Sequence, residues 1–122
     1  MEAIAEARHE GRIEIGLDVA ASEFFDPATK SYNLSQKQGT TDRVMTPDQL
    51  SDLFASLVER YPEIKSIEDP FDQDDFDAYV KLTHKLGNKV QIVGDDLLVT
   101  NPKRVRMGID QKMCNALLLK VN

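Results

Sequence analysis

The chain has 122 residues, of which 41% are hydrophobic, and this is enough for one compact domain but not for two. Acidic residues outnumber basic residues by 21 to 15, and the net charge of −6 would repel a phosphate backbone, which argues against nucleic acid as a partner. No hydrophobic run approaches the roughly 18 residues of a membrane span, and the charged residues 1–14 do not fit a signal peptide. A single cysteine, Cys114, excludes an internal disulfide framework. We therefore expect a soluble, cytoplasmic protein.

The first part of the chain changes from a helical to an extended pattern. Residues 1–9 are rich in alanine, the strongest helix former, and predict the end of a helix. Hydrophobic residues then alternate over residues 13–19, which predicts a β-strand with Asp18 at its far end. Residues 24–37, with Asp26-Pro27 among them, predict a β-hairpin with a long turn.

A clear helix start follows at Thr46. Thr46 can cap the helix, Pro47 suits its first position, and Gln49 completes a capping box with Thr46. One apolar stripe, able to cover a sheet, then runs along this helix until Pro62. It consists of Leu50, Leu53, Phe54, Leu57, Val58 and Tyr61.

The rest of the chain repeats a strand-and-helix unit. Strands are predicted at residues 64–67, 90–93 and 116–119, with a helix over residues 74–86 and a shorter one that starts at Asn101. Strands that alternate with helices imply a parallel sheet and an α/β fold. A complete eight-stranded barrel of this kind takes about 250 residues. We therefore expect about half of a TIM-like barrel, cut from a larger one.

Four polar residues stand where the predicted strands end: Asp18, Glu68, Asp95 and Lys120. The carboxyl ends of the strands carry the chemistry in such barrels. Three carboxylates brought together repel one another unless a cation neutralises them, and oxygen ligands suit Mg²⁺ better than Zn²⁺. Close to such a cation the pKa of Lys120 would be lowered, so that it could act as a base.

Plainer interpretations stand beside this one. An acidic residue at a strand end is more often a capping or loop residue, and we interpret Asp69 and Asp96 in that way. A lysine at a strand end is usually solvated. The basic cluster of Lys103, Arg104 and Arg106 is interpreted as the solvated face of a short helix.

Five stretches of the sequence resemble the enolase family. They are Ile15-Gly16-Leu17-Asp18-Val19-Ala20-Ala21-Ser22-Glu23-Phe24-Phe25, Ser66-Ile67-Glu68-Asp69-Pro70-Phe71-Asp72-Gln73-Asp74-Asp75, Val93-Gly94-Asp95-Asp96-Leu97, Thr100-Asn101-Pro102-Lys103-Arg104 and Leu117-Leu118-Leu119-Lys120-Val121-Asn122. The resemblance covers nearly the whole chain from Gly11 on, and residues 25–43 are the most divergent portion.

The resemblance implies a fold, an activity and a role for each of the four strand-end residues. It implies that Asp18, Glu68 and Asp95 bind the Mg²⁺ that holds the substrate carboxylate, that Glu68 and Asp95 also contact the substrate, and that Lys120 is the base that takes the proton from C2. Enolases are glycolytic lyases that convert 2-phosphoglycerate to phosphoenolpyruvate and water. They are homodimers, which makes this substrate and a second subunit the expected partners.

The resemblance also implies that part of the active site lies outside residues 1–122. In enolases the acid precedes this segment and the phosphate-binding residues follow it. We therefore expect one domain, a fragment of the C-terminal barrel domain, that is inactive alone. The alternative is a non-catalytic fragment that acts as a binding or antigenic module. A third interpretation is another enolase-superfamily enzyme, such as a sugar-acid dehydratase, although residues 66–75 and 117–122 favour enolase.

Overall fold

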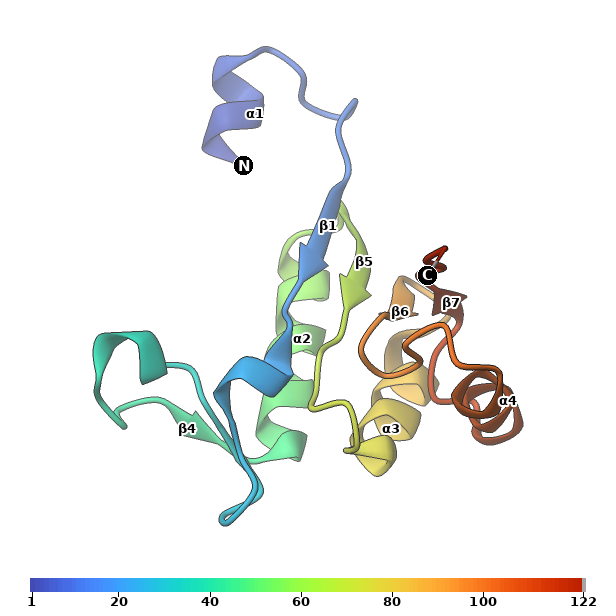
Figure 1. The fold of residues 1–122 in the computed structure, drawn as a ribbon. Helices are drawn as coiled ribbons and strands as arrows, with labels where there is room; N and C mark the ends of the chain where they lie inside the picture. The colour runs from blue at the N-terminus through green and yellow to red at the C-terminus, as the bar shows by residue number, and fades with distance from the viewer. Residues whose placement is uncertain (122) are drawn as a thin grey trace.

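The structure, a computed structural model, describes residues 1–121. Its main element is a four-stranded parallel sheet with the strand order β1-β5-β6-β7 (Figure 1). The strands are β1 (Ile15–Asp18), β5 (Ile64–Glu68), β6 (Gln91–Gly94) and β7 (Ala116–Leu117). Three helices connect them along the chain: α2 (Pro47–Arg60), α3 (Phe76–Leu86) and α4 (Pro102–Gln111). The predicted α/β fold with parallel strands is confirmed.

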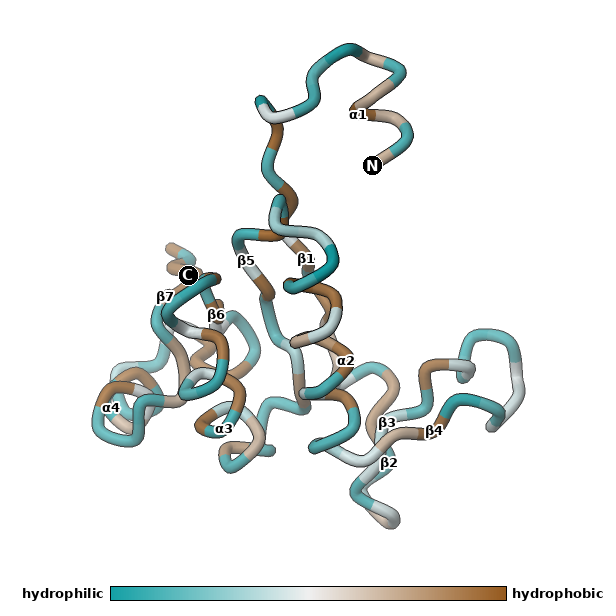
Figure 2. Tube along the Cα trace, turned by 180° about the vertical axis from the view of Figure 1, so that it is seen from behind, coloured by the Kyte–Doolittle hydropathy of each residue, from teal (hydrophilic) through white to brown (hydrophobic). Residues whose placement is uncertain are grey.

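The helix α2 covers β1 and β5 from one side, as the two opposite views show (Figures 1 and 2). Its start is the predicted one, because the Gln49 N–H donates to Thr46 Oγ1 at 3.3 Å and the Thr46 N–H donates to Gln49 Oε1 at 2.9 Å. Leu50, Phe54 and Val58 from the predicted apolar stripe are buried. Local capping and burial of one face thus both stabilise α2.

Several element bounds differ from the prediction by one or two residues, and the start of α3 and the end of β7 have a clear cause. The helix α3 begins at Phe76 and not at residue 74, because Asp72 holds the preceding residues in a turn: its Oδ1 accepts the Asp74 N–H and its backbone oxygen accepts the Asp75 N–H. The strand β7 ends at Leu117 and not at residue 119. Its neighbour β6 ends at Gly94, so the ladder has no further residues with which to pair.

The predicted hairpin is present as part of a second, antiparallel sheet. Its strands are β2 (Phe25–Asp26), β3 (Ser31–Asn33) and β4 (Val44–Met45), in the order β2-β3-β4. The turn between β2 and β3 spans residues 27–30, which is shorter than the predicted long turn, and Asp26 Oδ1 accepts the Ala28 N–H at 2.9 Å. Two 3-10 turns, η1 (Ala21–Phe24) and η2 (Gln36–Gln38), flank β2 and β3. A strand of two residues such as β4 leaves no alternation that a sequence pattern could reveal.

Tyr32 joins the small sheet to the main one. It is fully buried. Its hydroxyl group donates to Asp75 Oδ2 at 2.7 Å, and the Tyr32 hydroxyl oxygen accepts the Asp72 N–H at 2.9 Å. Its ring lies 5.0 Å from that of Phe25 and 5.9 Å from that of Phe71, centroid to centroid. Burial raises the pKa of the Tyr32 hydroxyl above its ordinary value, so the hydroxyl remains a donor. The small sheet is therefore fixed to the loop that follows β5.

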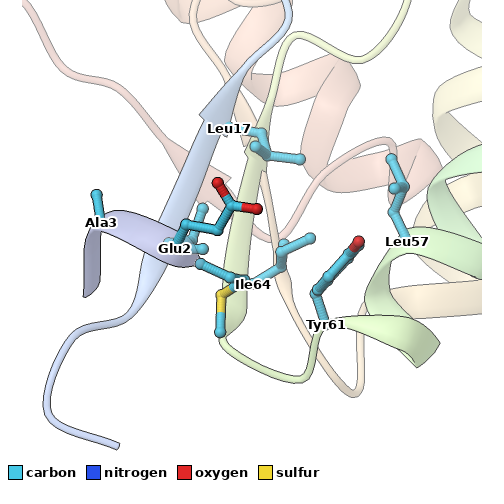
Figure 3. Close-up of a pocket in the computed structure, with 8 residues that line it drawn as sticks. Glu2, Ala3, Leu17, Leu57, Tyr61 and Ile64 are labelled. Atoms are coloured by element: carbon cyan, nitrogen blue, oxygen red, sulfur yellow. The ribbon is translucent and has the colours of Figure 1, made fainter. Parts of the chain in front are cut away.

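One short helix, α1 (Glu2–Glu6), lies apart from the body of the molecule (Figures 1 and 2). It has no buried residue. Between α1, the sheet and α2 is a groove of about 510 Å³ with Leu17, Leu57, Tyr61 and Ile64 in its wall (Figure 3). Ile64 is the first residue of β5, so this largely apolar groove reaches the amino ends of the strands and is not the candidate site.

Candidate functional site

The four predicted site residues lie at the carboxyl ends of the parallel strands. Asp18 ends β1 and is paired in register with Glu68, which ends β5. Asp95 directly follows Gly94, the last residue of β6. Lys120 comes three residues after the end of β7, and its Nζ donates to Asp95 Oδ2 at 2.7 Å. The parallel register thus brings residues that are far apart in the sequence to a single edge of the sheet.

The carboxylates at this edge act on one another electrostatically. Burial raises the pKa of Glu68, and repulsion from Asp18, Asp69 and Asp95 raises it further, whereas Lys120 lowers it. The pKa of Asp96 is raised in the same way, first by burial and then by Asp69 and Asp95. The edge therefore carries a concentrated negative charge that a cation would relieve.

Lys120 is held in place by two contacts. Besides the ion pair with Asp95, its backbone N–H donates to Thr100 Oγ1 at 3.0 Å. The hydrogen bond to Asp95 is the main cause that raises the pKa of Lys120. The prediction of a lowered pKa applies to a site that holds a cation, and with the carboxylates alone the shift has the opposite direction.

Sequence reasoning underestimated one residue of this site, Asp69. Glu68, Asp69 and Asp95 each offer an oxygen, and these oxygens lie within 4.8 Å of one another, whereas Asp18 is outside this set. Asp69 is only 3% exposed, and the interpretation of a loop or capping residue describes its contacts correctly but not its burial. The sequence around Asp69, at a strand end and before a proline, does not indicate burial. Asp69 is buried because the fold places β6 beside it.

The donor set fits a hard cation. The side chains that come together at this edge offer carboxylate oxygens, the ligand type that Mg²⁺ prefers. Within residues 1–121, this group of side chains contains neither histidine nor cysteine. The pKa of Glu68 is raised by burial and by the neighbouring carboxylates, although Lys120 lowers it. Glu68, Asp69 and Asp95 are the carboxylates whose oxygens come together, and Asp18 lies next to Glu68 at the same edge, so these four residues are the possible ligands of an ion.

The loop after β5 is braced by α4 through Arg104. Arg104 Nε donates to the Leu97 carbonyl oxygen at 2.6 Å, and its guanidinium donates to Asp74 Oδ1 at 3.0 Å and to the Gln73 carbonyl oxygen. It also lies 5.4 Å from the centroid of the Phe76 ring. The prediction of a solvated basic face is therefore wrong for Arg104, because the loops after β5 and β6 converge on its side chain.

A sheet of parallel strands, helices between them and a cluster of polar side chains at their carboxyl ends together define a β/α-barrel type of protein with its site at that edge. The whole chain, residues 1–122, matches the family described as "Enolase, C-terminal TIM barrel domain". The chain belongs to this enolase family, and its sheet is a partial TIM barrel.

Curated relatives agree with the family match. An enolase of Eimeria tenella is 58% identical over the full chain, and an enolase of Solanum lycopersicum is 58% identical over 98% of it. The protein named enolase 2 of Hevea brasiliensis is 57% identical, also over 98% of the chain. The chain spans 28%, 27% and 27% of the lengths of these three proteins. Within residues 1–121, no helix is long and apolar enough to cross a membrane.

Proposed function

We propose that this segment supplies the metal-binding carboxylates and the catalytic base of an enolase, which converts 2-phosphoglycerate to phosphoenolpyruvate and water. The observation that carries the proposal is the geometry of one strand edge, where the amine of Lys120 lies 2.7 Å from Asp95 beside the carboxylate of Glu68. An amine and a cation site at the same edge suit removal of a proton next to a carboxylate that is held on a metal.

Each residue has its own task in this proposal. Asp18, Glu68 and Asp95 bind Mg²⁺, which supplies positive charge to stabilise the charge that develops when the C2 proton is removed. Glu68 and Asp95 also contact the substrate. Lys120 takes the proton, and the contact of its backbone N–H with Thr100 fixes the stem from which its amine reaches the site.

The wider parts of the proposal rest on the family. They are a homodimeric assembly, a place in glycolysis and a cytoplasmic location. We also propose that residues 1–122 are one part of the barrel domain. We then expect no measurable dehydration activity from this segment by itself, because the acid and the phosphate-binding residues of enolases lie outside it. Catalytic groups that act as a unit are not additive, so the groups that remain give little catalysis without the others.

Two substitutions test these roles when this segment is carried within a complete enolase chain. Lys120→Ala should abolish exchange of the C2 proton with solvent, because it removes the base, and should leave Mg²⁺ binding largely intact, because Lys120 is not a metal ligand. Asp95→Asn should weaken Mg²⁺ binding and should also disturb proton exchange, because Lys120 loses its ion-pair partner. The measurements are deuterium incorporation at C2 and titration with Mg²⁺.

Lys89→Ala provides the matched control, because Lys89 is an exposed lysine in the turn before β6, at the opposite end of the strands. It should change neither measurement. If Lys120→Ala exchanged the C2 proton at the rate of the unsubstituted protein, Lys120 would not be the base. If substrate and Mg²⁺ bound without influencing each other, the segment would instead be a non-catalytic binding module.

A further inference from the structure

A buried carboxylate, that of Asp69, has an oxygen within 4.8 Å of the carboxylate oxygens of Glu68 and Asp95. Its Oδ1 accepts hydrogen bonds from the Asp95 N–H at 3.1 Å, from the Tyr79 hydroxyl at 3.2 Å and from the Leu97 N–H at 3.4 Å. Its Oδ2 accepts the Asp96 N–H at 2.8 Å. Three consecutive backbone amides of the loop after β6 thus point at one side chain.

The backbone of Asp69 contacts the strand β6 and the turn η1 that follows β1. Its N–H donates to the Val93 carbonyl oxygen in β6 at 3.0 Å, and its own carbonyl oxygen accepts the Ala21 N–H at 3.1 Å. Asp69 has a φ of +41°, a left-handed conformation that is unusual for a residue with a side chain. A single residue therefore joins the segments that follow β1, β5 and β6, and the three proposed ligands lie where these segments meet their strands.

The contacts of Asp69 argue against a role as a fourth ligand, although its oxygen lies within 4.8 Å of those of Glu68 and Asp95. An ionised carboxylate offers about four acceptor sites, and four donors already point at this one. The side chain is also buried. Binding a cation would require it to give up amides that have no other acceptor in the loop.

We propose that Asp69 is a positioning residue, which fixes the loop of residues 95–97 so that the carboxylate of Asp95 faces Glu68 before a cation binds. Partners that orient metal ligands in this way commonly decide affinity, because a ligand held in place loses less freedom on binding. The proposal rests on the proposed function in one respect: it takes the edge formed by Asp18, Glu68 and Asp95 as the cation site.

The test compares three variants of this segment within a complete enolase chain. Asp69→Asn keeps the shape of the side chain but turns an NH₂ group towards a backbone N–H, so it cannot accept from all three amides. Asp96→Asn also removes one negative charge near the site, from the loop after β6, and leaves the Asp69 carboxylate in place. Tyr79→Phe removes one donor to Asp69 but keeps all three amides bound. Two readouts are used: amide hydrogen exchange at residues 95–97 without Mg²⁺, and the Mg²⁺ dissociation constant.

We expect Asp69→Asn to accelerate exchange of the three amides at least about tenfold and to weaken Mg²⁺ binding about 10–100-fold. Asp96→Asn should leave exchange unchanged and weaken Mg²⁺ binding about fivefold at most, the effect of one nearby charge. Tyr79→Phe should lower thermal stability while the exchange at residues 95–97 stays close to that of the unsubstituted protein.

Unchanged exchange in Asp69→Asn would overturn the proposal, and so would a loss of Mg²⁺ affinity equal to that of Asp96→Asn. If Asp69→Asn does not fold, Asp69→Ser provides a smaller acceptor for the same measurements. Loss of the fold in both variants would also count against the proposal, because Asp69 would then support the whole domain and not this loop. The amide exchange experiment needs neither substrate nor activity. It therefore tests the role of Asp69 even if the unsubstituted chain does not dehydrate 2-phosphoglycerate and the proposed function fails.

Discussion

At the scale of single residues, side-chain amides and carboxylates hold the turns of this fold together. Asn115 is an example. Its Oδ1 accepts the Ile92 N–H at 2.7 Å, and its Nδ2 donates to the carbonyl oxygens of Gly87 at 2.9 Å and Val90 at 3.2 Å. It thereby joins the residues before β7 to β6 and to the turn that precedes β6.

We predict that Asn115→Ala lowers the free energy of unfolding by about 1–3 kcal/mol, because the Ile92 N–H is left without an acceptor. Asn115→Asp is the matched variant. It keeps the acceptor but turns a carboxylate oxygen towards the two carbonyl oxygens, and it should also destabilise the protein. The measurement is urea unfolding of the segment within a complete enolase chain. An unchanged urea midpoint for Asn115→Ala would show that these bonds do not contribute to stability.

Local signals explain why some elements were predicted from the sequence. The start of α2 was evident because Thr46, Pro47 and Gln49 act within one helical turn, and the four strands were found because the strand-and-helix unit repeats. The start of α3 and the end of β7 depend on contacts instead: Asp72 holds a turn, and β6 ends at Gly94.

The candidate site divides in the same way. The positions of Asp18, Glu68, Asp95 and Lys120 at one edge follow from the parallel order of the strands, so the sequence could predict them. The contacts of Asp69 and Arg104 join residues about 30 positions apart. The pattern of residues within a single helix or strand cannot predict such a contact. Sequence reasoning therefore treated both residues as surface features.

At the scale of elements, we predict that the cap of α2 matters more than its surface ion pairs. Thr46→Ala removes one half of the capping box and should destabilise the protein by about 1 kcal/mol. Lys81→Ala removes the Lys81–Asp48 pair between α3 and α2, whose nitrogen and oxygen lie 2.8 Å apart. Both of these side chains are largely exposed, so the loss of stability should be smaller than that of Thr46→Ala.

Thermal unfolding of the two variants at low and high salt separates these effects. The loss in Thr46→Ala should not depend on salt, because it comes from a neutral hydrogen bond. Any effect of Lys81→Ala should fade as salt screens the charges. A larger loss in Lys81→Ala than in Thr46→Ala would contradict this ranking.

At the scale of the whole molecule, the main sheet ends on both sides in a strand with one free edge. In the order β1-β5-β6-β7, the outer strands β1 and β7 have one neighbour each within residues 1–121. From the last residue of β7 on, every second residue is apolar and exposed: Leu117 is 40%, Leu119 70% and Val121 102% exposed. Free strand edges with exposed apolar side chains favour pairing with other chains.

We therefore predict that residues 1–122, expressed alone, associate in solution. Light scattering should give a mass that rises with protein concentration, and thermal unfolding should be broad. Leu119→Lys should reduce the association, because a charge beside the free edge of β7 opposes pairing with a second strand. Ile109→Lys is the control, since Ile109 is 64% exposed but lies on α4, away from a strand edge, so it should reduce association less. A monomeric mass at all concentrations, together with a sharp thermal transition, would show that the sheet is stable with its edges free. If Leu119→Lys and Ile109→Lys reduced association equally, the chains would associate through exposed apolar side chains in general and not through the edge of β7.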